Sequence, residues 1–249
     1  MASIGFSMIV AATPEGGIGY KGNIPWRLPN DMDHFMRITM HLGRTPGLLP
    51  YAPLPDESEG GVPEMPSKTT ASQADPECRN VVIMGRKTWH SIPKKFRPLR
   101  GRINVVLTRG DESIRSAIFS EGLVDSPVHI CTGFDEALND IANMHVTTGH
   151  TFVIGGSQLY SLALAHPQCH TIFLTQVEPL CPDSNADGSE SAIVNCDTFI
   201  PRIPMDSFQE LIPKDILRLL GPNVDLSKQK HKKFVYQYLV YTRTPAPIL

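Results

Sequence analysis

The sequence of 249 residues lacks a long hydrophobic run, because no stretch approaches the 18 consecutive apolar residues of a membrane-spanning helix. Residues 1–13 also lack a positively charged segment ahead of their apolar run, which a secretory signal peptide would show. We therefore expect no membrane partner and no export signal, and we expect a cytoplasmic protein.

Cysteine is scarce, and its spacing is unsuited to bridges or metal sites. The closest two of the five cysteines lie twelve residues apart, which argues against both a zinc ribbon and a disulfide framework. We interpret them as reduced thiols and expect no metal site. The five are Cys78, Cys131, Cys169, Cys181 and Cys196.

Positive charge is present mainly in one block. Residues 86–109 carry eight lysines or arginines and no acid, and with a net charge of −2 this leaves −10 on the rest of the chain. Such a block is typical of a site for an anionic ligand, although a solvated surface has the same composition. Nucleic acid is not an expected partner, because the overall balance is acidic and neither zinc-finger spacing nor an aromatic-rich ribonucleoprotein motif is found.

Short β-branched runs predict strands at residues 4–12, 80–84, 103–108, 128–131, 151–154, 171–177 and 233–241. Helical patterns lie between several of them: Asn30 and Thr132 are expected to cap helices, Arg86 to open a short one, and residues 157–165 to form another. Strands that alternate with helices need crossover connections. The predicted class is therefore α/β, with a mostly parallel sheet and an antiparallel strand at its C-terminal edge.

One segment interrupts this alternation. Residues 44–78 contain seven prolines, three glycines, and six acids against two basic residues. We interpret the segment as a surface insertion in a single domain that spans residues 1–249, because the flanking helix and strand read as consecutive elements without it.

Three predicted strands end in groups suited to anions. The first ends at Gly85 before Arg86, Lys87 and Thr88, the second at Thr108 and Arg109, and the third at Gly155 and Gly156 before a helix. Each could be an ordinary turn or a solvated helix start. Ligands of open α/β sheets gather at the carboxyl ends of the strands, so the three together indicate one extended polyanionic ligand.

Asp31 is the candidate acid. An acid in the first turn of a helix is usually explained by the helix dipole. Phe35 lies one helical turn later, however, so the carboxylate projects from the same face as an aromatic ring. A carboxylate beside apolar walls suits a flat, nitrogen-rich ring. The glycines at 16, 17 and 19 are weak evidence alone, since their spacing is not the classical dinucleotide fingerprint.

These segments resemble the dihydrofolate reductase family over nearly the whole chain outside residues 44–78. The resemblance is carried by GIG, PW and an acid at residues 17–31, by VVIMGRKTW at 81–89, by SIPKKFRPLRGRINVVLTR at 91–109, by FVIGGSQLY at 152–160, by Thr175, and by DTFIP at 197–201. The enlarged segment is similar to the loops of fungal or protist members, and Ile200 stands where phenylalanine is commoner. Some protist members are fused to thymidylate synthase, so the chain is interpreted as a monofunctional protein or an excised domain.

The resemblance implies NADPH-dependent reduction of 7,8-dihydrofolate to tetrahydrofolate, which serves one-carbon metabolism and thymidylate synthesis, on a mostly parallel eight-stranded sheet with flanking helices. It assigns catalysis to Asp31, which would favour protonation of N5, with Trp26 and Thr175 in support through hydrogen bonds, either direct or through water. Arg102 would bind the glutamate α-carboxylate. The expected substrate-binding residues are Ile9, Val10, Asp31, Met32, Phe35, Ile92, Phe96, Leu99, Arg102, Ile154, Tyr160 and Thr175.

The cofactor that the resemblance implies is NADPH, held along the strand ends and the glycine-rich loop, with a cis peptide bond at the pair Gly155 and Gly156. The expected cofactor-binding residues are Ala11, Ile18, Gly19, Tyr20, Lys21, Gly22, Asn23, Gly85, Arg86, Lys87, Thr88, Leu107, Thr108, Arg109, Gly155, Gly156, Ser157, Gln158 and Leu159. Antifolates of the methotrexate or trimethoprim type are expected ligands, and a monomer is expected.

Two alternatives stay open from the sequence. A pyrimidine reductase of riboflavin synthesis has a similar fold and also uses NADPH, but it fits Asp31 and Arg102 poorly. A catalytically silent nucleotide-binding module would keep the strand-end glycines and Arg86 and would need no acid in the pocket.

Overall fold

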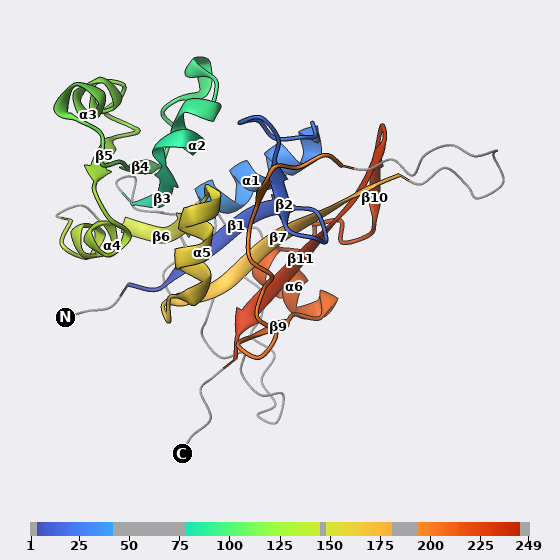
Figure 1. Ribbon diagram of the computed structural model, residues 1–249. Helices are drawn as coiled ribbons and strands as arrows, with labels where there is room; N and C mark the ends of the chain where they lie inside the picture. Colours follow the sequence, from blue (N-terminus) through green and yellow to red (C-terminus); the bar gives the residue numbers. More distant parts are fainter. Residues whose placement is uncertain (1–3, 42–77, 145–147, 181–193, 245–249) are drawn as a thin grey trace, which may run out of the picture.

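The structure, a computed structural model, describes residues 4–41, 78–144, 148–180 and 194–244. Within these residues a nine-stranded sheet forms the centre of the molecule (Figure 1). Its strands are β1 (Phe6–Ala12), β3 (Arg79–Gly85), β4 (Ile103–Leu107), β5 (Val128–Cys131), β6 (Thr148–Val153), β7 (Cys169–Pro179), β9 (Phe208–Glu210), β10 (Gln229–His231) and β11 (Phe234–Arg243). The order is β10-β11-β7-β1-β6-β3-β4-β5, and β9 also pairs with β11.

The sheet is parallel except at the edge formed by the C-terminal strands. β1 pairs in parallel with both β6 and β7, and β3 pairs in parallel with β4 and β6. β11 runs antiparallel to β7, with Tyr238 opposite Thr175. The predicted α/β class with an antiparallel C-terminal edge is confirmed. The ninth strand, β9, has only three residues, too few to show a strand period in the sequence.

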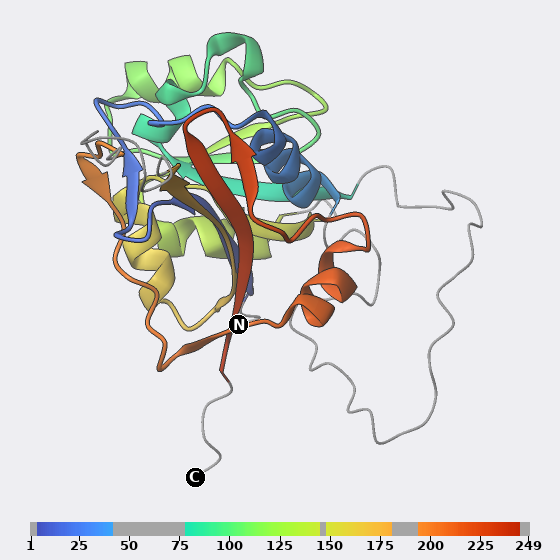
Figure 2. The same cartoon turned by 90° about the vertical axis from the view of Figure 1, so that its right-hand side faces the viewer.

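Helices cover both faces of the sheet. Successive residues of a strand point to opposite faces, and in these strands both sets are apolar, so each face needs a layer of helices. Val81 and Ile83 of β3 pack with α4 (Phe134–Ala142) and α5 (Ser157–Ala165), whereas Val82 and Met84 pack on the other face. That other face is covered by α1 (Pro29–His41), α2 (Arg86–Ser91), α3 (Glu112–Phe119) and α6 (Pro213–Leu220). Figure 2 shows α1 and α6 on one side of β11 and α5 on the other.

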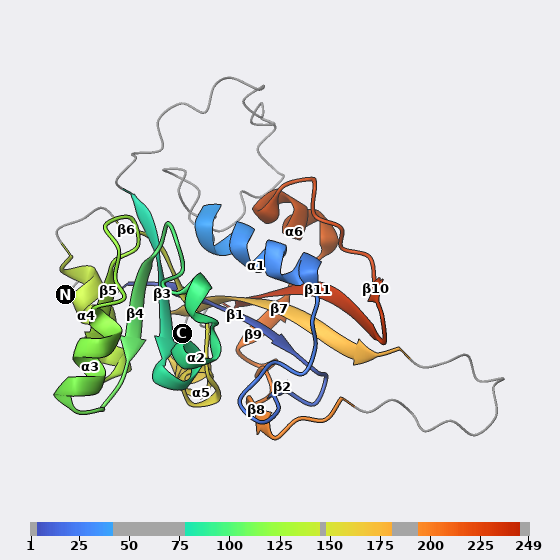
Figure 3. The same cartoon turned by 90° about the horizontal axis from the view of Figure 1, so that it is seen from above.

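Three smaller features complete the fold. A third apolar cluster lies under the antiparallel edge, where Trp26 and Leu28 pack with Val177 and Tyr238. A separate two-stranded sheet joins β2 (Gly17–Gly19) to β8 (Thr198–Phe199), and Figure 3 shows it across β1 from α1. A 3-10 turn, η1 (Lys94–Phe96), precedes β4.

The predicted helix caps are wrong in both cases, by two residues for α1 and by one for α4. α1 begins at Pro29, because the fixed φ of proline suits the first helical position, so Asn30 lies inside the helix. α4 is preceded by Gly133 rather than Thr132. The Glu136 carboxylate reaches back and accepts from the backbone N–H groups of Thr132 and Gly133 at 2.8 and 3.2 Å.

Two helices and several short strands were not predicted. α3 begins after Asp111, whose carboxylate accepts from Ile114 N at 3.0 Å. α6 begins with Pro213, and only Ile216 among its residues is fully buried. Each of these helices has only eight residues, about two turns, which gives a helical period little length over which to show in the sequence.

Several other expectations meet the structure only in part. The four cysteines in the described ranges are free thiols, and Cys181 lies outside them. Residues 44–77 of the predicted insertion also lie outside the described residues. None of the helices described is long and apolar enough to cross a bilayer. Across the same ranges, no three His, Cys, Asp or Glu side chains are grouped as a metal would need.

Candidate active site

A carboxylate from α1 and a hydroxyl from β7 form the centre of the candidate site. Thr175 Oγ1 donates a hydrogen bond of 2.6 Å to Asp31 Oδ1. Burial raises the pKa of Asp31 from its ordinary value of 3.8 to about 6, and the hydrogen bond from Thr175 opposes part of that rise. A carboxyl group with such a pKa changes its protonation state near neutral pH, as acid–base chemistry requires.

Tyrosines near this carboxylate stay neutral at physiological pH. Burial, with a smaller contribution from the charge of Asp31, raises the pKa of both Tyr160 and Tyr238. The Tyr160 hydroxyl donates to the backbone oxygen of Ile9 at 2.8 Å, which ties α5 to the central strand β1. Asp31 is thus the group in this cluster whose charge changes near pH 6.

Trp26 is buried beside this region, in the cluster that contains Leu28 and Tyr238. The hydrogen bond expected between Trp26 and Asp31 is not found as a direct contact among the described residues, where Thr175 is the side-chain partner of the carboxylate. The supporting role of Trp26 stays a prediction.

The apolar residues predicted for the substrate pocket divide into walls and rims. The walls pack in the cluster on the α1 face of the sheet and comprise Ile9, Phe35, Ile92, Leu99 and Ile154. Met32 on α1 and Phe96 on η1 are 55% and 57% exposed, so they form rims. Val10 packs with the α4 and α5 cluster, so its side chain lies on the opposite face from α1.

Arg102 is a buried cation that α1 holds in place. Its Nη1 donates to Thr39 Oγ1 at 2.7 Å, its Nε donates to the backbone oxygen of Arg100 at 3.1 Å, and its guanidinium lies 5.9 Å from the ring centre of Phe35. Only 5% of the residue is exposed. A positive group fixed beside the apolar walls suits a carboxylate at the far end of a long ligand.

The ends of β3 and β6 meet and form a glycine-lined surface. Gly85 N donates to the backbone oxygen of Gly155 at 2.7 Å, and the peptide bond between Gly155 and Gly156 is cis, as expected. A Cβ on Gly155 would lie 3.1 Å from the Tyr160 ring, and one on Gly156 would lie 3.2 Å from Thr88 Oγ1. α2 and α5 both begin here without a side-chain cap, so their first N–H groups remain available to phosphate oxygens.

Charged and polar side chains surround this surface. Arg86, Lys87 and Arg109 are exposed, and Ser157 and Gln158 begin α5. Thr108 is buried, with its hydroxyl accepting from Gly110 N at 3.0 Å, so this hydroxyl shapes the loop after β4. The positive charge of Arg86 also reaches Asp111, where it is the smallest of the effects that lower the pKa of that carboxyl.

The glycine-rich loop after β1 is held by the segment that contains β8. Lys21 N donates to Asp197 Oδ2 at 2.7 Å, Asp197 N donates to Gly19 O at 2.9 Å, and Ile200 N donates to Gly16 O at 2.9 Å. A Cβ on Gly16 would lie 2.6 Å from Ile200 O, so this approach needs glycine. The loop carries Ile18, Gly19, Tyr20, Lys21, Gly22 and Asn23, and its strand β2 pairs antiparallel with β8.

Sequence reasoning missed residues that position the site without lining it. Asp197 holds the glycine-rich loop, and Asn80 Nδ2 donates to Thr39 O at 3.0 Å, next to the hydroxyl that contacts Arg102. Asn104 contacts the main chain on either side of Arg100. The sequence did mark the two asparagines, because each stands inside an otherwise apolar strand pattern. A polar side chain buried in a strand needs hydrogen-bond partners, which indicates a positioning role.

Comparison with known proteins agrees with this geometry. The family model described as dihydrofolate reductase matches residues 5–45 and 76–216. The dihydrofolate reductase of Heliothis virescens is 31% identical over 217 residues, which cover 86% of this chain and 90% of that protein. That of Candida albicans is 28% identical over 98% of this chain and 100% of its own length.

Two further comparisons bear on length and fold. The bifunctional dihydrofolate reductase-thymidylate synthase of Daucus carota is 36% identical over 206 residues, and the chain spans only 29% of that protein. The solved structure of Schistosoma mansoni dihydrofolate reductase superposes with a TM-score of 0.63 at 21% identity, covering 98% of this chain and 100% of its own. The structural likeness supports the same fold.

Proposed function

The chain belongs to the dihydrofolate reductase family, and from this membership we propose that it reduces 7,8-dihydrofolate to tetrahydrofolate with NADPH. The observation that carries the proposal is Asp31, an acid with a pKa of about 6 that stands among apolar walls beside the strand ends. A nucleotide-binding module needs no such acid. A pyrimidine reductase would have little use for Arg102 at the far end of the same walls.

Asp31 acts on the pterin ring of the substrate. Its carboxylate accepts hydrogen bonds from the 2-amino group and N3, and the negative charge favours protonation at N5. Protonation at N5 makes C6 electrophilic enough to accept hydride. Thr175 fixes the carboxylate by its 2.6 Å hydrogen bond, so the acceptor atoms are oriented before the substrate binds.

The remaining predicted residues divide between binding of the ring and of the tail. Ile9, Phe35 and Ile154 exclude water from the ring, while Met32, Phe96 and Leu99 contact the aminobenzoyl portion. Arg102 binds the glutamate α-carboxylate through a charge-assisted pair. Antifolates of the methotrexate or trimethoprim type carry a 2,4-diamino ring that donates to the same Asp31 carboxylate.

The strand ends fit NADPH. Glycine at 155 and 156 lets the ends of β3 and β6 approach closely, since a Cβ there would crowd Tyr160 or Thr88. The uncapped starts of α2 and α5 direct N–H groups to a diphosphate. Arg86, Lys87, Thr88 and Arg109 hold the phosphates, including the 2′-phosphate that distinguishes NADPH from NADH. When bound, the cofactor supplies the hydride. The monomeric state, the single domain and the cytoplasmic location stay predictions.

The test is substrate-dependent oxidation of NADPH, followed as loss of reduced-nicotinamide absorbance. We expect oxidation with dihydrofolate and none with the pyrimidine intermediate of riboflavin synthesis. Oxidation with the pyrimidine alone would support that reductase instead. Cofactor binding without oxidation in either case would favour the silent nucleotide-binding module.

A further inference from the structure

The loop between η1 and β4, residues 97–102, carries two of the residues assigned above to the substrate tail. Leu99 packs against the cluster of the pocket walls, and Arg102 directs its guanidinium to Thr39 on α1. The loop has no regular secondary structure of its own beyond turns. Its main-chain groups therefore need partners from neighbouring elements, and these partners decide where Leu99 and Arg102 lie.

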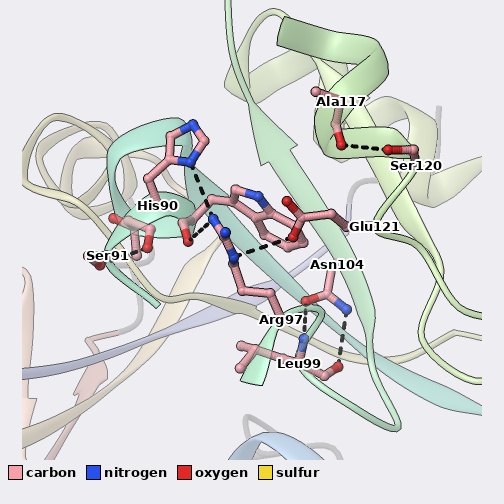
Figure 4. A network of polar contacts seen from close by, with 10 residues as sticks. His90, Ser91, Arg97, Leu99, Asn104, Ala117, Ser120 and Glu121 are labelled. Atoms are coloured by element: carbon pink, nitrogen blue, oxygen red, sulfur yellow. Dashed lines mark hydrogen bonds and ion pairs between the residues drawn. The ribbon is translucent and has the colours of Figure 1, made fainter. Parts of the chain in front are cut away.

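Asn104, the second residue of β4, supplies the partners of Leu99 and Arg102, while Ser126 Oγ accepts from Gly101 N at 2.9 Å. Its side chain accepts from Leu99 N at 2.9 Å, and its amide nitrogen donates to Leu99 O at 3.1 Å and to Arg102 O at 3.0 Å. Both amide hydrogens are thus used, and all three hydrogen bonds go to Leu99 and Arg102, the residues assigned to the substrate tail. Figure 4 shows the amide of Asn104 facing the main chain of Leu99.

Asn104 lies in a buried strand, so its amide would lower the stability of the fold unless all three of its hydrogen bonds form. Alternation places Ile103 and Val105 in the cluster on the α4 face, so Asn104 shares the α1 face with Val106. The asparagine has no exposed surface. An apolar residue would fill this place without any need for partners, whereas a buried amide must be fully hydrogen-bonded to be tolerated.

The start of the loop is held by Arg97 and does not depend on Asn104. Loss of the Asn104 hydrogen bonds should therefore change the positions of Leu99 and Arg102 without releasing the whole loop. Arg97 Nη1 donates to Trp89 O at 3.1 Å, its Nε lies 3.3 Å from Glu121 Oε2, and its guanidinium lies 5.4 Å from the Trp89 ring centre (Figure 4). These contacts attach residue 97 to α2 and to the turn after α3. Beyond residue 97, Asn104 joins Leu99 to Arg102 across the turn.

We propose that Asn104 is a positioning residue that sets Leu99 and Arg102 at the separation required by the aminobenzoylglutamate tail of dihydrofolate. The inference rests on the proposed function, because it takes the tail as the ligand of these two residues. Because Asn104 has no exposed surface and its side-chain hydrogen bonds go to Leu99 and Arg102, it offers no group of its own to the ring or the cofactor. Its effect is therefore confined to substrates that carry the tail.

The test compares dihydrofolate with a 6-methyl dihydropterin that lacks the tail, each at saturating NADPH. Asn104→Asp keeps the volume of the side chain and the acceptor for Leu99 N, but it replaces both N–H donations by oxygen. We expect kcat/KM for dihydrofolate to fall about 10- to 100-fold, mainly through KM, because displacement of a binding group by about 1 Å has effects of this size. The value for the tail-less substrate should change less than about 2-fold.

Val105→Ala is the matched control, because the next residue of β4 is equally buried but faces the opposite cluster. It should lower Tm and leave the ratio of the two kcat/KM values unchanged. If Asn104→Asp does not fold, Asn104→Ser serves the same comparison, since it leaves room for water to reach the same main-chain groups.

Equal losses on both substrates, or an unchanged ratio, would overturn the positioning role. Failure of the proposed function has a different signature. In that case the unmodified protein would oxidise NADPH with neither substrate, and no ratio would exist to compare.

Discussion

Asp31 shows how one residue combines a cost to stability with a catalytic use. Burial raises its pKa from 3.8 to about 6, so the ionised carboxylate is less favourable in the folded protein than in the unfolded chain. This cost is fully present above about pH 6, declines as the pH falls, and vanishes below about pH 4. The fold therefore bears a destabilising charge at the pH where the reaction needs it.

We predict that Asp31→Asn separates these two effects. At neutral pH turnover should be mostly lost, because the amide cannot favour protonation at N5, and some activity should return at acidic pH, where N5 is protonated from solvent. At neutral pH the free energy of unfolding should rise by about 1 to 3 kcal/mol, and the gain should disappear towards pH 4. Steady-state rates and thermal melts at three pH values check both parts, and near-normal neutral turnover would remove Asp31 from the mechanism.

Arg102 is predicted to act on one ligand only. Arg102→Leu should weaken dihydrofolate far more than NADPH, because a charge-assisted pair contributes about 1.5 to 3 kcal/mol, or about 10- to 150-fold in affinity. Fluorescence titration with each ligand measures this. The control is Arg100→Leu, an exposed neighbour in the same loop, which should change neither affinity. Equal losses for both ligands would place Arg102 outside the substrate site.

At the scale of elements, the polyanion site arises because parallel strands end together. β3, β4 and β6 lie side by side in the sheet, and each ends at the same edge. Arg86 follows the end of β3 and Arg109 the end of β4, so two cations that lie 23 positions apart in the chain face one region. α2 and α5, the helices that follow β3 and β6, both start without a side-chain cap, so their first N–H groups are not already bonded to a capping side chain.

We predict that these two arginines determine cofactor preference. Arg86→Gln with Arg109→Gln should reduce the preference for NADPH over NADH, because the positive charge around the 2′-phosphate is removed while the diphosphate surface of glycines remains. The kcat/KM values for both cofactors measure it. Lys228→Gln with Lys230→Gln, at the other edge of the sheet, removes the same charge and should leave the ratio alone. An unchanged ratio in the arginine variant would mean that other residues read the phosphate.

At the scale of the whole molecule, the elements on either side of the predicted insertion contact each other directly. α1 ends at His41 and β3 begins at Arg79, and the hydrogen bond of 3.0 Å from Asn80 Nδ2 to Thr39 O joins the two elements directly. Asn80 Oδ1 also accepts from His150 N at 2.8 Å, which attaches the same point to β6. The elements on either side of the insertion are thus fixed to each other by the core.

We predict that residues 45–77 can be replaced by a short Gly/Ser linker with folding retained. Loop-closure entropy changes slowly with length, so the free energy of unfolding should change by only about 1 kcal/mol, and activity should stay within a few-fold. Tm and the KM for dihydrofolate test this. A large fall in Tm or a rise in KM would show that the segment, whose most apolar residues are Leu48, Leu49, Tyr51 and Leu54, is part of the folded domain or of the substrate entrance.

The sequence by itself determined the elements and the candidate chemistry. β-branched runs located the seven longer strands to within a few residues, because the strand period is local. Glycines after strands, basic residues after Gly85, and an acid one helical turn before Phe35 indicated the ligand groups for the same reason. Elements of three residues, and the eight-residue helices α3 and α6, were too short to leave such a local record.

Only the tertiary structure decided which residues meet. Thr175 and Asp31 are 144 positions apart, and their hydrogen bond exists because β7 lies beside β1 under α1. The sequence placed Val10 in the substrate pocket, whereas the pleat of β1 turns its side chain to the other face. The partners of Asn104 and Asn80 depend likewise on the course of a turn and on the order of the strands. Strand order and turn geometry result from packing of the whole chain, so no local pattern encodes them.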